Sequence, residues 1–446
     1  MMRARIETAG WSERPVAMRL PFQFGSTEVR ETAEAHCELR CVIDGRDVIG
    51  QSAQLMVPRW FDKRAGLSNS ETIDELRATV TAACEPAIGM EGPAVAITRE
   101  LRSEAARKLP PETPALAAGF GPALVEMALI DAICRAAGLA FWQAAREDVF
   151  GLVPNCPEDL GPDALRASLS RITPPETIAL RHTIGFDAPL LRSEVGADAP
   201  RDGLPVSVEE VIVATGISAF KIKLKGAPEA DLARLRAIAS VIDRLPSHSV
   251  TLDANEQYAV APFCEFLDGL VNDAALARLR AGLRFVEQPF ARETALEEPV
   301  EAALPLVIDE SDDAEDSFAR ALKLGWAGTS IKSCKGVLRA LINRARADAA
   351  GAILSGEDLT CQPGLCWQQD TAMAAACGVQ DVERNGHHFA GGMQGASAEE
   401  IEARLAAHAD IYTRSGSAPA LKLEHGEVAI ASLGKPGFGN IIKETN

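Results

Sequence analysis

Short apolar runs alternate with segments of helical periodicity over the second half of this chain. From Ile178 onward the runs are rich in Val, Ile and Leu, and helical segments such as 229–244 and 314–324 lie between them. A closed (β/α)8 barrel requires eight strand-and-helix units of this kind, and eight runs are present. The strands are expected near residues 179–182, 220–223, 250–253, 285–287, 306–309, 330–332, 352–355 and 380–383.

The first part of the chain has a different pattern. Alternating residues over 37–43, followed by Asp44-Gly45, predict an antiparallel strand and a hairpin turn. Helical periodicity follows over 70–83 and 123–145, whereas 147–175 is irregular and rich in Pro, Asp and Gly. The pattern therefore predicts an α+β unit in front of an α/β barrel.

The tail after Ala396 returns to mixed structure. It contains a predicted helix over 398–407 and a strand-like stretch over 427–430, and we expect it to fold back onto the N-terminal unit. A chain of 446 residues is too long for one ordinary core, so two domains are expected.

Composition and net charge argue against some classes of binding partner. The formal net charge of -18 argues against nucleic acid and against an anionic membrane surface, since both require a basic face. The most apolar helical stretch, 124–134, carries Glu126 and Asp131 and is expected to be too short to span a bilayer. No signal peptide is expected in 1–25, and the 10 cysteines lack the paired spacing of a zinc site, so we expect reduced thiols and a cytoplasmic protein.

Charged residues end five of the apolar runs. Asp253, Glu287 and Asp309 each follow a different strand, and one carboxylate oxygen from each leaves room for water and substrate around Mg²⁺. Taken singly, each of these acids is better explained as a helix cap than as a metal ligand, and salt bridging to the lysines is a further alternative. Asn255 faces the same way as Asp253 and is either a donor to a bound carboxylate or a turn former.

Lysines flank these acids along the chain. Lys221 and Lys223 lie two residues apart, so both face the barrel mouth, and their mutual repulsion predicts a lowered pKa suited to a general base. The competing interpretation is a pair of solvated lysines. Lys332 ends the sixth run, opposite the second strand in an eight-strand ring, whereas Lys335 is expected to face solvent or to begin a helix.

In order, the motifs FKIK, TLDAN, FVEQP, VIDES and SIKSCK resemble those of the enolase superfamily, in the muconate lactonizing enzyme subgroup of the mandelate racemase/muconate lactonizing enzyme family. The resemblance covers 178–391. It implies an enolase-like modified TIM barrel in residues 151–395, with an α+β capping domain formed by 1–150 and completed by 396–446. It also implies that such barrels assemble, so we expect a homo-oligomer.

The resemblance implies a role for each matching residue. Lys223 corresponds to the base, Lys221 to its electrostatic partner and Lys332 to the acid/base on the opposite face. Asp253, Glu287 and Asp309 correspond to the Mg²⁺ ligands. Loops near 21–27 and 57–66 would close over the substrate, which makes Trp60 and Phe61 candidate lid aromatics as well as candidate core residues.

The chain departs from the family pattern in two places. The glycine pair expected after the sixth-strand lysines is reduced to Gly336-Val337. The eighth strand reads VERNGHH and lacks the Asp-x-Asp with which dipeptide epimerases hold a substrate ammonium, so that substrate class is disfavoured. The histidine–aspartate dyad of the mandelate racemase branch is missing as well. Glu357, His387 and His388 are candidate substrate contacts, with loop packing as the alternative for the histidines.

These residues predict Mg²⁺-dependent removal of a proton next to a carboxylate through a stabilised enediolate. Two bases favour isomerisation of a small carboxylic acid (racemisation, epimerisation or cycloisomerisation), while dehydration by β-elimination of an acid sugar or hydroxy acid needs only one. Two rivals of other types stay open: an aldolase that forms a Schiff base on a lysine, and a barrel that binds without catalysis.

Overall fold

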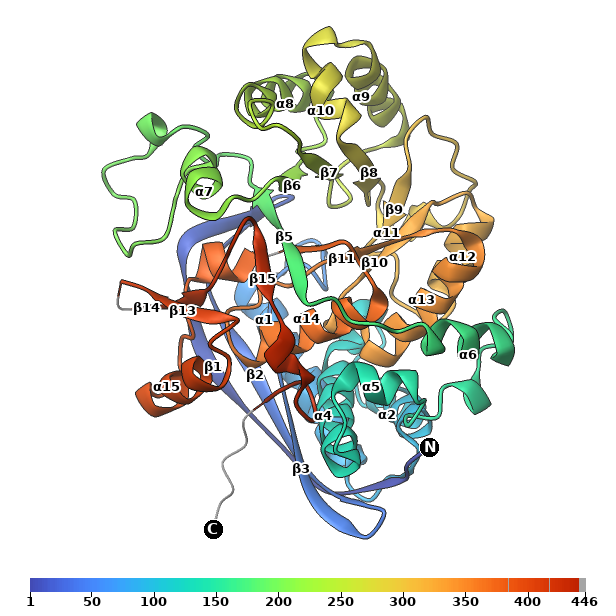
Figure 1. Cartoon of the computed structure of the whole chain (residues 1–446). Coiled ribbons are helices and arrows are strands. Elements are labelled where there is room, and N and C mark those ends of the chain that lie inside the picture. Colours follow the sequence, from blue (N-terminus) through green and yellow to red (C-terminus); the bar gives the residue numbers. More distant parts are fainter. Residues whose placement is uncertain (384, 417, 441–446) are drawn as a thin grey trace.

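The computed structural model describes residues 1–383, 385–416 and 418–440, which form three β-sheets with helices packed around them. One sheet has four antiparallel strands in the order β3-β2-β1-β4. A second contains the parallel strands of a barrel, and a small third sheet lies in the C-terminal tail. In Figure 1 the long strands β1 and β2 reach from the foot of the picture to the barrel.

The antiparallel sheet is built from the N-terminal residues. Its strands are β1 (Ala4–Phe24), β2 (Thr27–Ile43), β3 (Arg46–Leu55) and the short β4 (Glu91–Gly92). Asp44 and Gly45 join β2 to β3 with φ of 48° and 80°, the positive values that a tight hairpin turn requires, so the predicted turn is confirmed. The length of β1 was not expected, because Gly10 and Pro15 interrupt its alternation.

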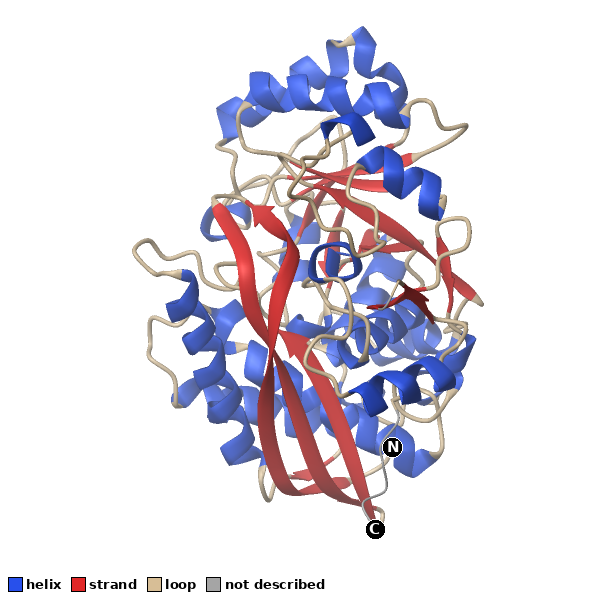
Figure 2. Cartoon of the chain, turned by 90° about the vertical axis from the view of Figure 1, so that its left-hand side faces the viewer, coloured by secondary structure: helices blue, strands red, loops and turns tan. Residues whose placement is uncertain are grey.

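Helices cover one face of this sheet (Figure 2). They are α1 (Asn69–Ala87), α2 (Ala94–Arg107), α3 (Ala115–Ala118), α4 (Phe120–Ala137) and α5 (Phe141–Arg146). The single helix expected over 123–145 is wrong, because Gly138 takes a left-handed conformation, φ 69°, and ends α4 there. Helix α4 packs directly on β2 and β3 and is buried along almost its whole length.

The helical stretch Ala115–Ala137 is 23 residues long and apolar enough, by length and composition, to cross a membrane, which corrects the shorter stretch expected from the sequence. However, 89% of its most apolar window is buried inside the fold. This is the arrangement of the central helix of a core, whose apolar residues pack on the sheet instead of lipid.

Eight parallel strands close into a barrel, since β12 pairs with β5 through Val382 and Leu180. All eight strands expected from the apolar runs are present, which confirms the predicted fold class. They are β5 (Thr177–Ile184), β6 (Ala219–Lys223), β7 (Ser249–Asp253), β8 (Leu283–Glu287), β9 (Leu306–Ile308), β10 (Gly328–Ile331), β11 (Ile353–Gly356) and β12 (Asp381–Glu383).

Helices separate and surround the barrel strands. The expected helices over 229–244 and 314–324 correspond to α8 and α12. The region expected to be irregular, 147–175, nevertheless contains α6. The helices are α6 (Pro162–Ser170), α7 (Val208–Thr215), α8 (Pro228–Ile242), α9 (Val260–Asn272), α10 (Ala277–Ala281), α11 (Arg292–Ala295), α12 (Ser317–Lys323), α13 (Val337–Ala350) and α14 (Leu365–Cys377). Short 3-10 turns cover Val153–Asn155, Arg192–Glu194, Ala274–Leu276, Ser333–Lys335 and Ala431–Gly434, and a π-helical turn covers Gly386–Ala390.

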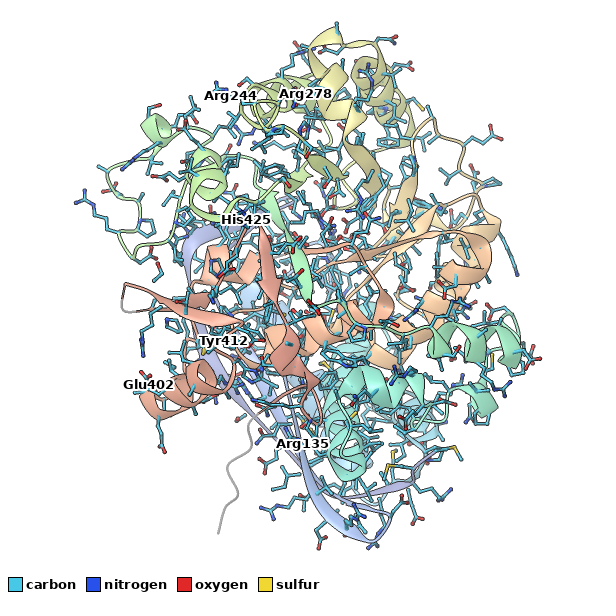
Figure 3. All side chains as sticks on the ribbon, viewed as in Figure 1. Arg135, Arg244, Arg278, Glu402, Tyr412 and His425 are labelled. Carbon is cyan, nitrogen blue, oxygen red and sulfur yellow. The ribbon has the colours of Figure 1, made fainter. Side chains whose placement is uncertain are left out.

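The C-terminal tail contacts both parts of the chain. Helix α15 (Ala398–Ala407) has the predicted bounds, and Glu400 pairs with Arg14 of β1 at 2.9 Å. Arg135 of α4, labelled in Figure 3, donates to the carbonyl of Asn440 at 2.6 Å. Strands β13 (Tyr412–Ser415) and β14 (Ala418–Leu421) form the small sheet.

Strand β15 (Glu427–Ala429) corrects one expectation. It pairs antiparallel with barrel strand β5, with Val428 opposite Ile178, and so joins the barrel sheet instead of the N-terminal unit. The domain bounds expected at residues 150 and 396 stay a prediction.

Close packing of α4 on the sheet generates a stability prediction. A Cβ at Gly50 would meet the carbonyl oxygen of Ala128 and lie 2.8 Å from the Cβ of Ala132. We expect Gly50→Ala to lower the free energy of unfolding by about 2–3 kcal/mol, as overpacking does, when measured by urea denaturation. Gly10→Ala is the matched control on the same sheet, because its Cβ would have no neighbour within 4 Å. Equal stability of the two variants would contradict the close approach.

Candidate active site

The candidate site lies at the carboxyl ends of the barrel strands. Lys223, Asp253 and Glu287 are the last residues of β6, β7 and β8, and they lie opposite one another in the strand register. Asp309 and Lys332 directly follow β9 and β10. Because all eight strands are parallel, these five side chains gather at one end of the barrel, as in other barrels of this type.

Lys221 occupies a cage of four buried carboxylates. Its Nζ lies 2.9 Å from both Asp253 Oδ2 and Glu287 Oε2, 2.6 Å from Glu357 Oε2 and 3.2 Å from Glu383 Oε2. Burial lowers the pKa of Lys221, but the carboxylates outweigh it and raise the pKa well above its usual value. The lowering expected for one lysine of the Lys221–Lys223 pair does not occur at Lys221, which is a fixed positive charge.

Lys223 faces the cavity at the mouth of the barrel. Its Nζ donates to Asp253 Oδ2 at 2.6 Å and to Asn255 Oδ1 at 2.9 Å. Asn255 in turn donates from Nδ2 to Glu310 Oε1 at 3.2 Å. Asn255 lines the cavity and has a φ of 44°, so it takes part both in the turn after β7 and in the site.

Lys332 reaches the same cavity from β10. It donates to Asp309, and its Nζ lies 4.5 Å from the centre of the Trp60 ring, a cation–π contact. Burial lowers the pKa of Lys332, but Asp309 and Glu287 outweigh it and raise the pKa. The two lysines expected to flank the substrate, Lys223 and Lys332, therefore line one cavity from nonadjacent strands.

The solvent-facing position expected for Lys335 is wrong. Lys335 is only 3% exposed, at the end of a 3-10 turn, and its Nζ lies 2.9 Å from Asp309 Oδ1. It also donates to the Asp309 carbonyl at 2.6 Å and to Ser330 Oγ at 3.0 Å. Sequence spacing alone does not reveal this, because the turn after β10 bends the side chain back beneath Lys332.

The three acids expected to hold a cation come from adjacent strands and are fully buried. Burial and neighbouring Asp253 and Glu357 raise the pKa of Glu287 well above its usual range. Its Oε1 has no hydrogen-bond partner among the described residues. A buried carboxylate oxygen without a partner is costly, and a hard divalent cation would satisfy it. In donor type, Asp253, Glu287 and Asp309 therefore fit Mg²⁺.

In the structure, lysine ammonium groups lie between these acids. Lys221 bridges Asp253 and Glu287, while Lys332 and Lys335 both contact Asp309. In the described part of the chain, no three acidic, histidine or cysteine side chains form a compact metal cluster. The three carboxylates can therefore converge on one ion only after a lysine or a carboxylate has moved.

Aromatic and aliphatic side chains close the cavity from the N-terminal domain. Phe22 and Phe24 come from the end of the β1–β2 hairpin, and Val57 and Trp60 come from the lid segment, which we define as residues 57–66. The cavity is small, with a volume of about 20 Å³. The side chains of both expected loops therefore line it, including Trp60. Phe61 does not, since its ring packs on Phe120 at 5.1 Å between centroids.

The lid segment is tied to the barrel by charged residues that the sequence pattern does not reveal. Arg292 donates to the carbonyl oxygens of Phe61 and Trp60, each at 3.0 Å. Lys63 pairs with Glu256, and with Glu310 at 3.1 Å. We call Lys63, Glu256, Arg292 and Glu310 the lid latch.

A second charged network lies below the cavity. Glu357, a candidate substrate contact, bonds Lys221 and Arg181 and does not line the cavity. Arg181 also pairs with Asp381. Glu383, not singled out from the sequence, does line the cavity and accepts from Asn385 at 2.7 Å. Glu357 thus contacts Lys221, and its expected contact with substrate stays a prediction.

The structure places His387 and His388 elsewhere. They line a separate cavity with His182, whose ring lies 4.7 Å from that of His388. His387 Nδ1 accepts from the Leu421 amide at 3.1 Å. Neither histidine lines the candidate active-site cavity, and the choice between substrate contact and packing stays a prediction. Arg384, in the same motif, lies outside the described residues.

Comparison with known proteins agrees with this geometry. The family model described as "Enolase C-terminal domain-like" matches residues 204–445, more than half of the chain. No curated protein sequence matches this chain significantly. The chain therefore belongs to the enolase C-terminal domain-like family, in its mandelate racemase/muconate lactonizing enzyme group. The chain is thus an enzyme of the enolase superfamily.

Solved structures show the same fold at low sequence identity. Muconate lactonizing enzyme from Pseudomonas fluorescens, complexed with muconolactone, is 16% identical with a TM-score of 0.63, covering 99% of this chain and 97% of that one. The L-Ala-D/L-Glu epimerase from Bacillus subtilis is 17% identical with a TM-score of 0.61, covering 98% of both chains. A dipeptide epimerase from Methylococcus capsulatus, complexed with Mg and L-Arg-D-Lys, is 20% identical with a TM-score of 0.61, covering 98% and 99%.

The lid latch generates a pH-dependent prediction. Burial raises the pKa of Glu256, but Arg292 and Lys63 outweigh it and hold the pKa below its usual value. A depressed folded-state pKa stabilises the protein above the unfolded pKa of about 4.3, and that stability is lost as pH falls through the folded pKa.

We therefore expect Glu256→Gln to lower the free energy of unfolding by about 1–3 kcal/mol at pH 7, and by progressively less below about pH 4. Denaturant unfolding across this pH range measures the difference. Glu298→Gln, at an exposed position, is the control and should change little at any pH. A Glu256→Gln effect that grows on acidification would contradict the latch.

Proposed function

We propose that this protein removes the proton next to the carboxylate of a small carboxylic acid in a Mg²⁺-dependent reaction and isomerises the acid. The observation that carries the proposal is that Lys223 and Lys332 line one closed cavity from nonadjacent strands, above three buried acids. Removing a proton from one face of a carbon and returning one to the other requires bases on two sides of it.

Asp253, Glu287 and Asp309 would hold the cation through one carboxylate each. When bound, Mg²⁺ supplies positive charge where the substrate carboxylate gains negative charge as its α-proton leaves. The Mg-bound epimerase from Methylococcus capsulatus has the same fold, which supports the choice of metal.

The chain's own residues perform the proton transfer. Lys223 takes the α-proton in one direction, and Lys332 delivers or takes a proton on the opposite face. Lys221 stays charged within its four carboxylates and adds a positive charge beside the substrate carboxylate. Trp60, Phe22 and Phe24 exclude water, which strengthens these electrostatic contacts.

Two working bases favour isomerisation over β-elimination, which needs only one. Racemisation, epimerisation and cycloisomerisation all follow from the same proton removal, and the residues around the substrate decide among them. Glu383 and Asn385 lie at the end of the eighth strand, where dipeptide epimerases carry paired aspartates. The ammonium group of a dipeptide substrate would therefore lack those two partners in this protein. We further propose a cytoplasmic homo-oligomer.

Deuterium uptake tests the proposed reaction. With Mg²⁺ and a carboxylate library in D₂O, we expect deuterium at the α-carbon of the true substrate, read by NMR or mass spectrometry. Lys223→Ala and Lys332→Ala should each slow turnover by about 10²–10⁴-fold, as loss of a general acid or base does. Lys225→Ala, an exposed lysine after the same strand, is the control and should retain full exchange. Undiminished exchange in both active-site variants would exclude these lysines as bases.

Metal binding can be tested without a substrate. Mg²⁺ added to EDTA-treated protein should raise the melting temperature by about 2–5 °C, because a ligand of the native state stabilises it. Glu287→Gln should abolish this shift, and the exposed control Glu293→Gln should keep it. Calorimetry or dye-based melting is a suitable measurement. An equal shift in Glu287→Gln would place the ion elsewhere.

A further inference from the structure

A second cavity lies between the capping domain and the barrel, apart from the candidate active site. It has a volume of about 120 Å³ and lies between α2 of the first domain and α13 of the barrel. Three arginines face it: Arg99 and Arg102 from α2, and Arg339 from α13. In Figure 1 α2 lies at the lower right and α13 at the right at mid-height, both remote from α8.

Two of these guanidinium groups, those of Arg102 and Arg339, do not use all of their N–H donors in hydrogen bonds to the described residues. The Nε of Arg339 is buried and has no hydrogen-bond partner in the described part of the chain. Arg102 donates to the Lys335 carbonyl at 3.2 Å and lies 3.8 Å from Glu126 Oε2. Burial and the neighbouring charge of Arg339 lower the pKa of Arg102, while Glu126 opposes this. Arg102 and Arg339 carry like charge and repel one another in this partly buried cavity, and Glu126 offsets part of that repulsion.

The acids of the cavity are already engaged. Glu315 pairs with Arg99 at 2.5 Å, and Glu126 Oε1 accepts from the Leu338 amide at 3.1 Å. Asp313 accepts from Ser317 Oγ at 3.0 Å. Each acid thus has a hydrogen-bond or ion-pair partner, whereas the Nε of Arg339 has none among the described residues.

A buried hydroxyl adds a further donor. Thr98 of α2 is 5% exposed, and its Oγ1 has no hydrogen-bond partner among the described residues. A threonine within a helix often bonds a carbonyl of the preceding turn, and this one does not. Thr98 lines the same cavity as Arg102 and Arg339.

We propose that this cavity binds a small oxoanion, phosphate or carboxylate, between Arg102 and Arg339, with Thr98 as an additional donor. Guanidinium groups present forked donors that match the oxygens of either anion. The volume admits an ion of this size but not a nucleic acid chain. This inference does not depend on the proposed reaction.

The site is connected to the catalytic end of the barrel. Arg102 bonds the Lys335 carbonyl, and the Lys335 side chain contacts Asp309. An anion that repositions Arg102 therefore acts on the turn that carries Lys332 and Lys335.

Calorimetric titration of EDTA-treated protein tests the proposal, with inorganic phosphate in one arm and succinate in the other at constant ionic strength. Arg339→Gln and Arg102→Gln should each weaken binding about tenfold or more, since each removes a charge-assisted contact. Thr98→Val should weaken it less. Arg339→Lys keeps the charge without the fork and should lie between wild type and Arg339→Gln.

Arg244→Gln is the matched control, because Arg244 is exposed at the end of α8 and far from α2 (Figure 3). It removes the same charge and should bind like the wild type. Circular dichroism melting of each variant separates lost binding from lost folding. The arm that gives the tighter binding identifies the anion. The proposal is overturned if neither anion binds at about 20 mM, a concentration above a millimolar Kd. It is also overturned if binding survives both arginine variants, which would assign the anion to the lysines of the barrel mouth.

Discussion

Pairing of buried lysines with buried carboxylates is the constraint on which the rest of the structure depends. Lys223, Asp253 and Glu287 lie in register at the ends of three adjacent strands, so the barrel forces cations and anions into one layer. Unpaired, each of these charges would cost several kcal/mol in the interior. Lys221 within four carboxylates shows how this cost is offset. The charged mouth of the closed barrel is therefore internally compensated.

The same ion pairs determine what must change before a metal ion can bind the three acids. Each of the three acids that fit Mg²⁺ already has an ammonium neighbour, so a divalent ion and the lysines compete for the same oxygens. Glu287, with an unpartnered oxygen, is the acid at which the internal pairing is incomplete. A lysine released from its carboxylate is then available to the substrate. The ion pairs therefore hold Lys223 and Lys332, the lysines proposed as bases, in place before any ligand arrives.

The parts of the fold that follow local rules were predictable from sequence. Each barrel strand is a short apolar run, and the hairpin at Asp44-Gly45 has its own turn signal. The charged strand ends could be found because barrel topology brings them together. Lys63 and Arg292 could not, because the lid latch joins positions far apart in the chain. The break at Gly138 depends on one residue within an otherwise continuous helical pattern.

Lys335 shows why local pattern fails at the site itself. As a charged residue just before a helix it has the sequence context of a surface position, yet tertiary contacts bury it. Its side chain fixes Asp309 and its carbonyl accepts from Arg102 of the first domain. One residue thus links a metal-ligand candidate to the domain interface, and only the folded structure brings both partners to it. The candidate active site and the interface cavity are consequently joined by hydrogen bonds to one residue, through a single backbone turn.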